Sequence, residues 1–432
     1  MSEKSSISTK ISDFSADSVT TGGRPDGSSN FRTVINFALV AVGVGILALP
    51  RAIAQGGWIL GSVLLAVAWS VAQYGTYLLY RCMYMHPKGE ERFDSFQAIG
   101  KACFGKPGEI FTAFVQYLDL LLVCSLLVIL VGDGMYELVP QLDRIWWCVI
   151  FVCVMLPLAM LPTMKEVAFV SFIGITAAFV TVIAVIGASV RESSDPIKEH
   201  EHYLMPQNAS TAVLAFTNFM NAFAVTTVVP TLVDNMQKPK QFPRVLAAGF
   251  FVIVAIFAAI AYSGYAGFGH DLLDYPNITY AIAYGRSRGD WLVIIVQVAI
   301  EVVCFSHFLV MFNPVCVGVE DALEAIHGGK VRHWIKMISR AILMVICFVI
   351  AVSVPGFGSL VDLIGATAVM LLQIVFPVVF FLVLERKRVK IGFKSAFGSV
   401  VSKYVQYVVM AICLVLAIIG MIFGTWSAIT NW

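Results

Sequence analysis

The chain is poor in charged residues. Asp, Glu, Lys and Arg make up 13% of its 432 residues, which is about half the usual share for a soluble globular protein. Hydrophobic residues, by contrast, make up 59%. The basic residues are dispersed and the net charge is only +2, so nothing indicates a nucleic acid partner. This composition excludes a soluble protein and is typical of one that crosses a lipid bilayer several times.

Several catalytic motifs are also missing. The sequence contains no HExxH, no GxSxG and no phosphate-binding loop, which argues against a membrane enzyme and against a nucleotide-driven pump. The triplet His200-Glu201-His202 lies beside Glu199 in an acidic loop and has no third defined ligand. We interpret it as part of a solvated loop and predict neither a metal nor a cofactor.

Long apolar stretches dominate the rest of the chain. About 20 apolar residues suffice to cross the hydrocarbon core as a helix. The sequence predicts an all-α polytopic membrane protein with eleven transmembrane helices. They are expected at about 33–54, 58–83, 110–132, 145–163, 167–190, 211–233, 244–267, 291–316, 335–354, 359–384 and 404–426. Residues 1–32 are rich in Ser, Thr and Gly, and we expect a disordered tail there.

The distribution of Lys and Arg predicts the orientation. Most of them lie in the N-terminal tail and in alternate loops, the last of which runs from Arg386 to Lys403. Positive charge favours the cytosolic side. The N-terminus is therefore expected in the cytosol and the C-terminus outside or in a lumen. Asn208 and Asn277 begin two N-x-Ser/Thr triplets in predicted outer loops, which makes them candidate glycosylation sites.

Two spans carry residues that interrupt a helix. The first contains Gly43-Val44-Gly45 and then Pro50, and each glycine costs about 1 kcal/mol in a helix interior. The sixth has Asn218, Asn221 and Thr226 at mid-depth. Five spans separate the two, so they cross in opposite directions. This pattern is typical of two five-helix repeats in inverted orientation, about 33–190 and 211–384, with the helix at 404–426 added. Close packing of small residues and ordinary hydrogen bonding are the alternative explanations.

These motifs resemble the amino acid/auxin permease family over about residues 31–426. The resemblance rests on Gly43 to Pro50 followed by Gly56-Gly57, and on Pro230 to Met236, which is most similar to the vesicular inhibitory amino acid transporter branch. It implies a leucine-transporter-like fold and secondary transport of amino acids, often driven by protons. Arg51 and Asp362 depart from the family pattern and are expected to alter substrate choice or gating. We expect Asp362 to be solvated near the outer surface.

The interrupted spans suggest how a zwitterion would bind. Amides at the start of a half-helix suit a carboxylate, and unwound carbonyls suit an ammonium. The expected carboxylate site is formed by the amides of Val44, Gly45 and Ile46. The remaining expected substrate-binding residues are Ala41, Val42, Gly43, Asn218, Asn221, Ala222, Phe223, Ala224 and Thr226.

Ionisable side chains inside spans are candidates for ion coupling. A charged group at mid-bilayer costs about 2.5–3.5 kcal/mol on insertion scales, so it needs a partner, a cavity or a proton. Glu301 is the first candidate, Asp119 the second and His307 the third. His307 is expected to point away from Glu301, which shares a helix face with Gln297. Sodium coupling would instead need Ser306 and carbonyls near Val40.

The sequence therefore predicts a proton-coupled carrier of small or neutral amino acids. A sodium-coupled carrier, a channel, or a sensor that binds amino acids without moving them would fit the same fold. The membrane in question is the plasma membrane or that of a vacuole or vesicle.

Overall fold

The computed structural model describes residues 27–86, 92–160, 164–194, 200–284, 290–329, 331–354, 356–393, 396 and 400–430. Within these residues the regular secondary structure is helical, and one isolated β-bridge joins Ser28 to Met236. The elements of the first half, in order, are α2 (Asn30–Ala41), η1 (Val44–Ala48), α3 (Leu49–Gly56), α4 (Trp58–Met83), α5 (Phe96–Phe104), α6 (Lys106–Leu138), α7 (Arg144–Ala159) and α8 (Met164–Ser193).

The second half begins with another interrupted helix. Its elements are α9 (Ala209–Ala222), η2 (Thr226–Val228), α10 (Val229–Asp234), η3 (Pro239–Gln241), α11 (Phe242–Phe268), η4 (Gly269–Leu273), α12 (Ile278–Ala283), α13 (Trp291–His327), α14 (His333–Ser353), α15 (Phe357–Ile364), η5 (Gly365–Val369), η6 (Leu371–Val375), α16 (Phe376–Lys390), α17 (Val400–Ile419), η7 (Gly420–Gly424) and α18 (Thr425–Thr430).

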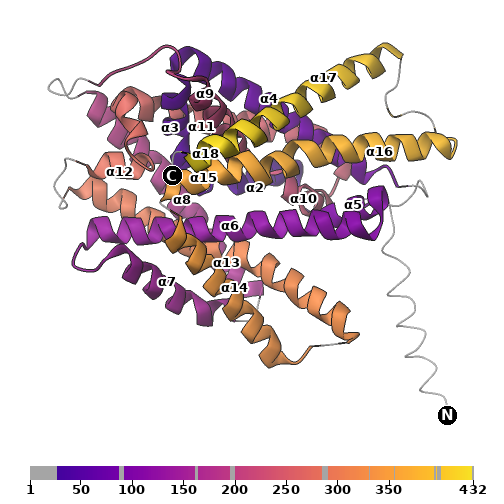
Figure 1. Cartoon of the computed structure of the whole chain (residues 1–432), viewed down its shortest axis with the longest axis horizontal. Helices are drawn as coiled ribbons and strands as arrows, with labels where there is room; N and C mark the ends of the chain where they lie inside the picture. The colour runs from indigo at the N-terminus through magenta and orange to yellow at the C-terminus, as the bar shows by residue number, and fades with distance from the viewer. Residues whose placement is uncertain are drawn as a thin grey trace.

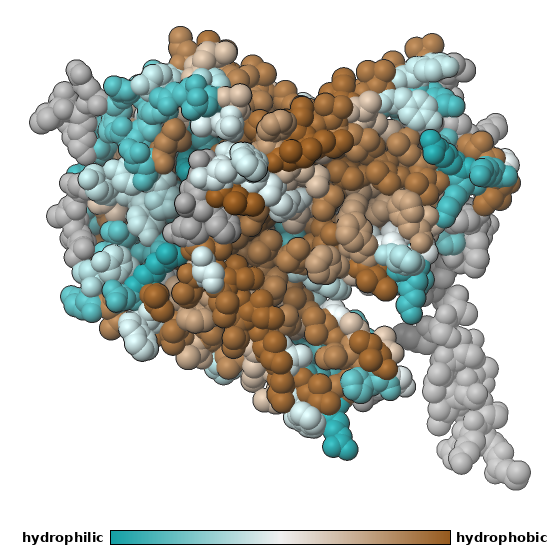
Figure 2. All heavy atoms as spheres, viewed as in Figure 1, coloured by the Kyte–Doolittle hydropathy of each residue, from teal (hydrophilic) through white to brown (hydrophobic). Residues whose placement is uncertain are grey.

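The long helices run roughly along the long axis of the molecule. In Figure 1, α6 and α16 lie along that axis, with α5 at the right and α12 at the left. We call the end at which α2 begins the N-terminal face and the other end the opposite face. Hydrophobic residues cover the middle of the molecule in Figure 2, and hydrophilic residues gather towards its left and right ends. This distribution fits a bilayer around the middle of the molecule.

The number of helices that can cross a membrane is close to the eleven expected. Nine helices in the described ranges are long and apolar enough, and α2 with η1 and α3 makes a tenth as one bent span. The stretch expected at 145–163 forms α7, which has only 16 residues and ends at Ala159. Residues 161–163 lie outside the described part of the chain.

The start of the fold lies before the predicted boundary. Residues 1–26 lie outside the described ranges, but α2 begins at Asn30 and Ser29 caps it. Ser28 donates its amide to Asn235 and accepts one from Gln237. Residues 28–32 therefore belong to the folded domain, and the tail predicted for residues 1–32 is too long by at least these five.

Two π-helical turns interrupt the tenth span. Residues Gly365–Val369 and Leu371–Val375 are π-helical, and Pro377 follows as one of the first residues of α16. Proline has no N–H and its ring crowds the preceding turn, so the helix before it widens. The widened turns place Gln373 against α4 and against the break in the sixth span.

Candidate functional site

The first span breaks at the predicted glycines. α2 and the segment Val44–Gly56 meet at an angle of 54°. Between them Val42 has ψ of 72° and Gly43 is extended. Pro50 stands in the first turn of α3, where its missing N–H costs nothing. Glycine has a low helix propensity, and Pro50 suits the first turn of a helix. One helix therefore ends before Gly43 and another begins after it.

The break leaves two backbone amides without a partner among the described residues. The amide of Gly43 donates to Ala41 and that of Ile46 to Gly43. Within the described part of the chain, no acceptor is found for the amides of Val44 and Gly45. An unpaired buried amide costs about 1–3 kcal/mol unless something binds it. Two of the three amides expected to hold a carboxylate are therefore free to do so, and the third, Ile46, is already used.

The sixth span unwinds at Phe223 to Val225. Gln373 bridges this gap: its Nε2 donates to the carbonyl of Phe223 at 3.0 Å, and its Oε1 accepts the amide of Thr226 at 3.2 Å. The hydroxyl of Thr226 lies 2.9 Å from that of Thr76 in α4. The carbonyl of Phe223 also accepts the amide of Val225. Protein groups thus occupy this carbonyl and Thr226, so neither is open to a substrate in this structure.

The two breaks lie next to each other. A Cβ atom added at Gly45 would lie 3.5 Å from the Cα atom of Ala222, so η1 crosses the end of α9 at close range. Gly43, Gly45, Asn221 and Ala224 keep part of their surface accessible, although they lie midway along their spans. Ala41, Val42, Ile46, Ala222 and Phe223 are buried. The predicted substrate residues at the two breaks therefore gather in one place, and four of them offer accessible surface.

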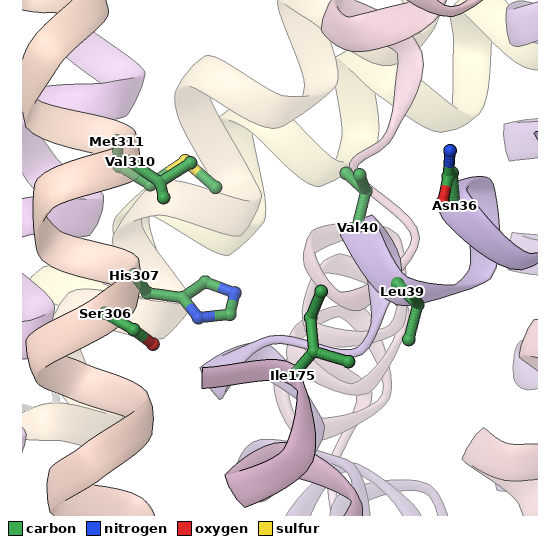
Figure 3. Close-up of a pocket in the computed structure, with 8 residues that line it drawn as sticks. All are labelled: Asn36, Leu39, Val40, Ile175, Ser306, His307, Val310 and Met311. Atoms are coloured by element: carbon green, nitrogen blue, oxygen red, sulfur yellow. The ribbon is translucent and has the colours of Figure 1, made fainter. Parts of the chain in front are cut away.

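A cavity of about 240 Å³ adjoins the first break on the side of the N-terminal face. Figure 3 shows the ring of His307 pointing from α13 towards Val40 of α2, with Ile175 of α8 below it. Ser306 lies beside His307 in the same wall. The rest of the lining comes from Asn36, Leu39, Val310 and Met311.

His307 also touches the break itself. A Cβ atom at Gly43 would lie 3.3 Å from Nε2 of His307, so the ring packs against the bare glycine backbone. The third candidate for ion coupling thus lies directly at the break in the first span.

On the other side of the break, a cluster of polar side chains joins α3 to α9 and α15 and closes the opposite face. Nη1 of Arg51 in α3 lies 3.6 Å from Oδ2 of Asp362 in α15. Nδ2 of Asn218 in α9 donates to Asp362 at 2.6 Å and lies 3.1 Å from Oε1 of Gln55. We call these four side chains the outer cluster. Because Asp362 is only 4% exposed, the prediction that it is solvated is wrong. Asn218 belongs to this closure and does not line the cavity.

Glu301 occupies a different place from His307. It lies in α13 and packs against Gly134 of α6, where even a Cβ atom would collide with its Oε1 and lie 3.1 Å from Oε1 of Gln297. The expected shared face with Gln297 is therefore present. Both carboxyl oxygens of Glu301 are buried and have no hydrogen-bond partner among the described residues. Asp119 in α6 likewise has one buried oxygen without a partner, and it does not line the cavity at the break.

The two candidate glycosylation sites differ. Asn208 is exposed just before α9. Asn277 is 1% exposed, and its Oδ1 accepts the amide and the hydroxyl of Thr279 as the cap of α12. A glycan does not fit on a buried capping side chain, so the structure argues against Asn277 as an acceptor.

The sequence also matches known proteins. Residues 26–430 match the family described as "Transmembrane amino acid transporter protein". The chain belongs to this family. Amino acid transporter AVT1C of Arabidopsis thaliana is 27% identical over 422 residues, which are 94% of this chain and 70% of that protein. AVT1I from the same plant is 26% identical over 87% of this chain and 91% of its own length.

Solved structures confirm the leucine-transporter-like part of the predicted fold. Mhp1, a nucleobase-cation-symport-1 family transporter, matches with a TM-score of 0.59 at 13% identity, over 96% of this chain and 93% of its own. MhsT in complex with L-phenylalanine matches with a TM-score of 0.50 at 13% identity, over 94% of this chain and 99% of its own. The chain therefore has a leucine-transporter-like fold and is an amino acid transporter family member, not an enzyme.

Three structural residues were not anticipated from the sequence. Gln55, Thr76 and Gln373 each join the interrupted helices to a neighbour. Gln373 is the only amide side chain within the apolar stretch 359–384. A polar side chain buried in a membrane span needs a partner. The isolated amide of Gln373 was therefore the sequence signal that could have indicated a structural role.

Proposed function

We propose that this protein is a proton-coupled secondary carrier of small or neutral amino acids that works by alternating access. The observation that carries the proposal is the 54° break in the first span, with two unpaired amides next to the unwound sixth span. Such amides bind a carboxylate without introducing a charged side chain. Because no charged side chain lies among the predicted substrate residues, we expect the substrate side chain to be neutral.

The two halves of the molecule differ in a way that supports alternating access. The cavity with His307 lies on the N-terminal side of the break, whereas the outer cluster closes the opposite side. A carrier must expose one site to each side in turn. The second conformation would open the outer cluster and close the cavity. Eleven helices and two inverted repeats, each beginning with an interrupted span, fit this proposal.

The environment of Glu301 supports coupling to protons. A charged carboxyl buried without a partner is costly, and a bound proton removes that cost. We propose that Glu301 carries the coupling proton and that movement of α6 against α13 exposes it for release. Asp119 and His307 are the second and third candidates.

Glu301→Gln tests this role. We expect the variant to lose the stimulation of uptake by a pH gradient in proteoliposomes, while exchange of labelled for unlabelled amino acid continues. Glu324→Gln on the same helix is the matched control, since Glu324 is part-exposed and paired with Lys336 at 2.9 Å. Stimulation that persists in Glu301→Gln would exclude Glu301 from coupling.

A sodium-coupled carrier is the second candidate, because one observation favours it. Ser306 and Val40, which sodium binding was expected to need, line the same cavity. The hydroxyl of Ser306 donates to the carbonyl of Val303 at 2.9 Å, so its oxygen can still accept. Uptake that responds to a sodium gradient and is lost in Ser306→Ala would favour this candidate over the proton.

A further inference from the structure

A second cavity, of about 480 Å³, lies on the opposite face beyond the outer cluster. We call it the outer vestibule. Its volume is within the range of about 300–1,000 Å³ found for small-molecule sites. Five charged side chains line it, from α3, α6, α7 and the turn before α12: Arg51, Asp133, Glu137, Arg144 and Asp274. Tyr280 of α12 lines it as well. The outer vestibule thus differs from the cavity at the break, where His307 is the one ionisable side chain among the described lining residues.

The two arginines of the outer vestibule are only partly paired. Arg144 donates from Nε to Asp133 at 2.6 Å, and Arg51 faces Asp362 through Nη1. Nη2 of Arg144 and Nε of Arg51 are buried and lack an acceptor within the part of the chain that the structure describes. A guanidinium has five donors in a planar fork that matches a carboxylate. Those two atoms are buried, but both side chains line the outer vestibule and are partly exposed, 20% for Arg51 and 31% for Arg144, so their other N–H groups can reach an anionic group there.

Asp133 is held in place on two sides. Besides Arg144, the hydroxyl of Tyr280 donates to it. Burial, followed by the neighbouring charge of Asp133, raises the pKa of Tyr280 above its usual value, so the phenol remains a donor. Asp133 therefore has partners on two sides, and its ion pair positions the Arg144 guanidinium.

The outer vestibule also carries free negative charge. Glu137 is half-buried and Asp274 exposed, and no ion pair to either is found in the described ranges. Donors for a carboxylate and acceptors for an ammonium thus line one cavity. A simple anion would be repelled by the carboxylates, and a simple cation by the arginines, whereas a zwitterion meets both.

We infer that the outer vestibule is a second amino acid site, in which Arg144 and Arg51 bind the α-carboxylate and Glu137 and Asp274 bind the α-ammonium. This inference rests on the proposed function, because it takes the cargo to be an amino acid. It adds a site that the substrate occupies before it reaches the interrupted helices.

Binding there would act on the outer cluster. The 3.6 Å separation of Arg51 and Asp362 is longer than the 2.7–2.9 Å typical of a charge-assisted hydrogen bond. A substrate carboxylate that takes the Arg51 guanidinium in a closer geometry competes with Asp362. Occupation of the outer vestibule thereby weakens the contact that closes the opposite face.

Protection of Arg144 from a guanidinium-specific reagent tests the site in the unmodified protein. The purified chain in lipid nanodiscs is treated with phenylglyoxal, and modification of Arg144 and Arg191 is followed by mass spectrometry. The ligands are glycine, L-alanine and L-leucine, each compared with its amide, which lacks the carboxylate. Arg191 is the internal reference, because it is 56% exposed on the same face and outside the vestibule.

Ligand supplied at about ten times its Kd leaves about one site in eleven free, so we expect at least one of these amino acids to slow modification of Arg144 about tenfold. Its amide should give no protection, and Arg191 should react at the same rate throughout. Protection should persist in Gly45→Leu, which obstructs the inner site. No protection, equal protection by the amide, or its loss in Gly45→Leu would each overturn the inference.

Uptake measured on the same preparation separates the two proposals. Uptake of an amino acid that leaves Arg144 unprotected would refute the outer site and leave the carrier function standing. Protection with no uptake of any amino acid would support the outer site and contradict transport.

Discussion

Asp362→Asn removes the charge on which the outer cluster depends. Asp362 accepts a hydrogen bond from Asn218 and faces Arg51 at 3.6 Å. Asparagine keeps the shape and can still hydrogen-bond to Asn218, but it no longer attracts the guanidinium. Arg51 is 20% exposed at its side chain, so it remains partly hydrated in the outer vestibule. The substitution should therefore weaken the closed conformation without leaving a fully buried charge.

The size of the effect follows from two opposing quantities. At 3.6 Å the attraction is about 5 kcal/mol for an effective dielectric constant of about 20. The cost of removing Asp362 from water offsets most of it, because buried pairs gain little net energy. A net loss of about 1–2 kcal/mol remains. The ratio of open to closed outer face should rise about five- to thirtyfold.

Labelling of a cysteine behind the outer cluster measures this ratio. Ala222→Cys places a thiol beside the first break, in a chain whose exposed native Cys153 is replaced by serine. A membrane-impermeant maleimide supplied on the opposite face should label it about five- to thirtyfold faster in Asp362→Asn. Asp290→Asn is the control, because it breaks a pair with Arg191 on the same face outside the cluster.

Two results would refute the reasoning about the outer cluster. Labelling at the same rate in Asp362→Asn and the parent would mean that the Arg51 pair does not hold the face closed. An equal increase in Asp290→Asn would mean that any loss of negative charge on this face has the same effect.

Three further predictions concern the breaks and the surface. Gly45→Ala should transport at close to the parental rate, because its Cβ atom would lie at an ordinary contact distance of 3.5 Å from the Cα atom of Ala222. Gly45→Leu should transport at background level. Equal transport rates for the two variants would contradict the close crossing of η1 and α9. Gln373→Leu should lower the melting temperature by several degrees in a fluorescence-detected unfolding assay, because each hydrogen bond lost at the second break costs about 1–3 kcal/mol; an unchanged temperature would show that the amide is dispensable. On a gel, Asn208→Gln should remove any glycan-dependent shift and Asn277→Gln should remove none, and the reverse result would contradict the burial of Asn277.

The local features of the fold could be predicted because they depend on short stretches of sequence. Glycine propensity and the position of Pro50 indicated the break in the first span, and the structure bends by 54° at that point. Apolar length indicated most of the spans. α7 is shorter than expected, and Pro157 lies near its end. Hydropathy alone does not show at which residue a helix ends.

The long-range pairs could not be predicted in this way. Arg51 and Asp362 stood out individually as departures from the family pattern, but nothing in their spacing of more than 300 residues indicated that they meet. Asp362 was expected to be solvated because it lies near a span end. The structure buries it because α15 packs against α6, α9 and η1, which is a property of the tertiary arrangement.

Helix periodicity gave the direction of side chains within one helix and no information on neighbours. It correctly placed Glu301 and Gln297 on one face and His307 on another. It could not show that Gly134 leaves room for Glu301, or that His307 faces Gly43. The choice between them as the coupling residue therefore depends on contacts that only the structure supplies.

Uptake by the purified protein in proteoliposomes tests the central claim most directly. Vesicles are offered a panel of radiolabelled amino acids, with and without an imposed pH gradient. We predict saturable uptake of at least one small or neutral amino acid, accelerated by the gradient and reduced to background in Gly45→Leu. Binding without flux for the whole panel, or uptake unchanged in Gly45→Leu, would contradict a carrier built on the broken first span.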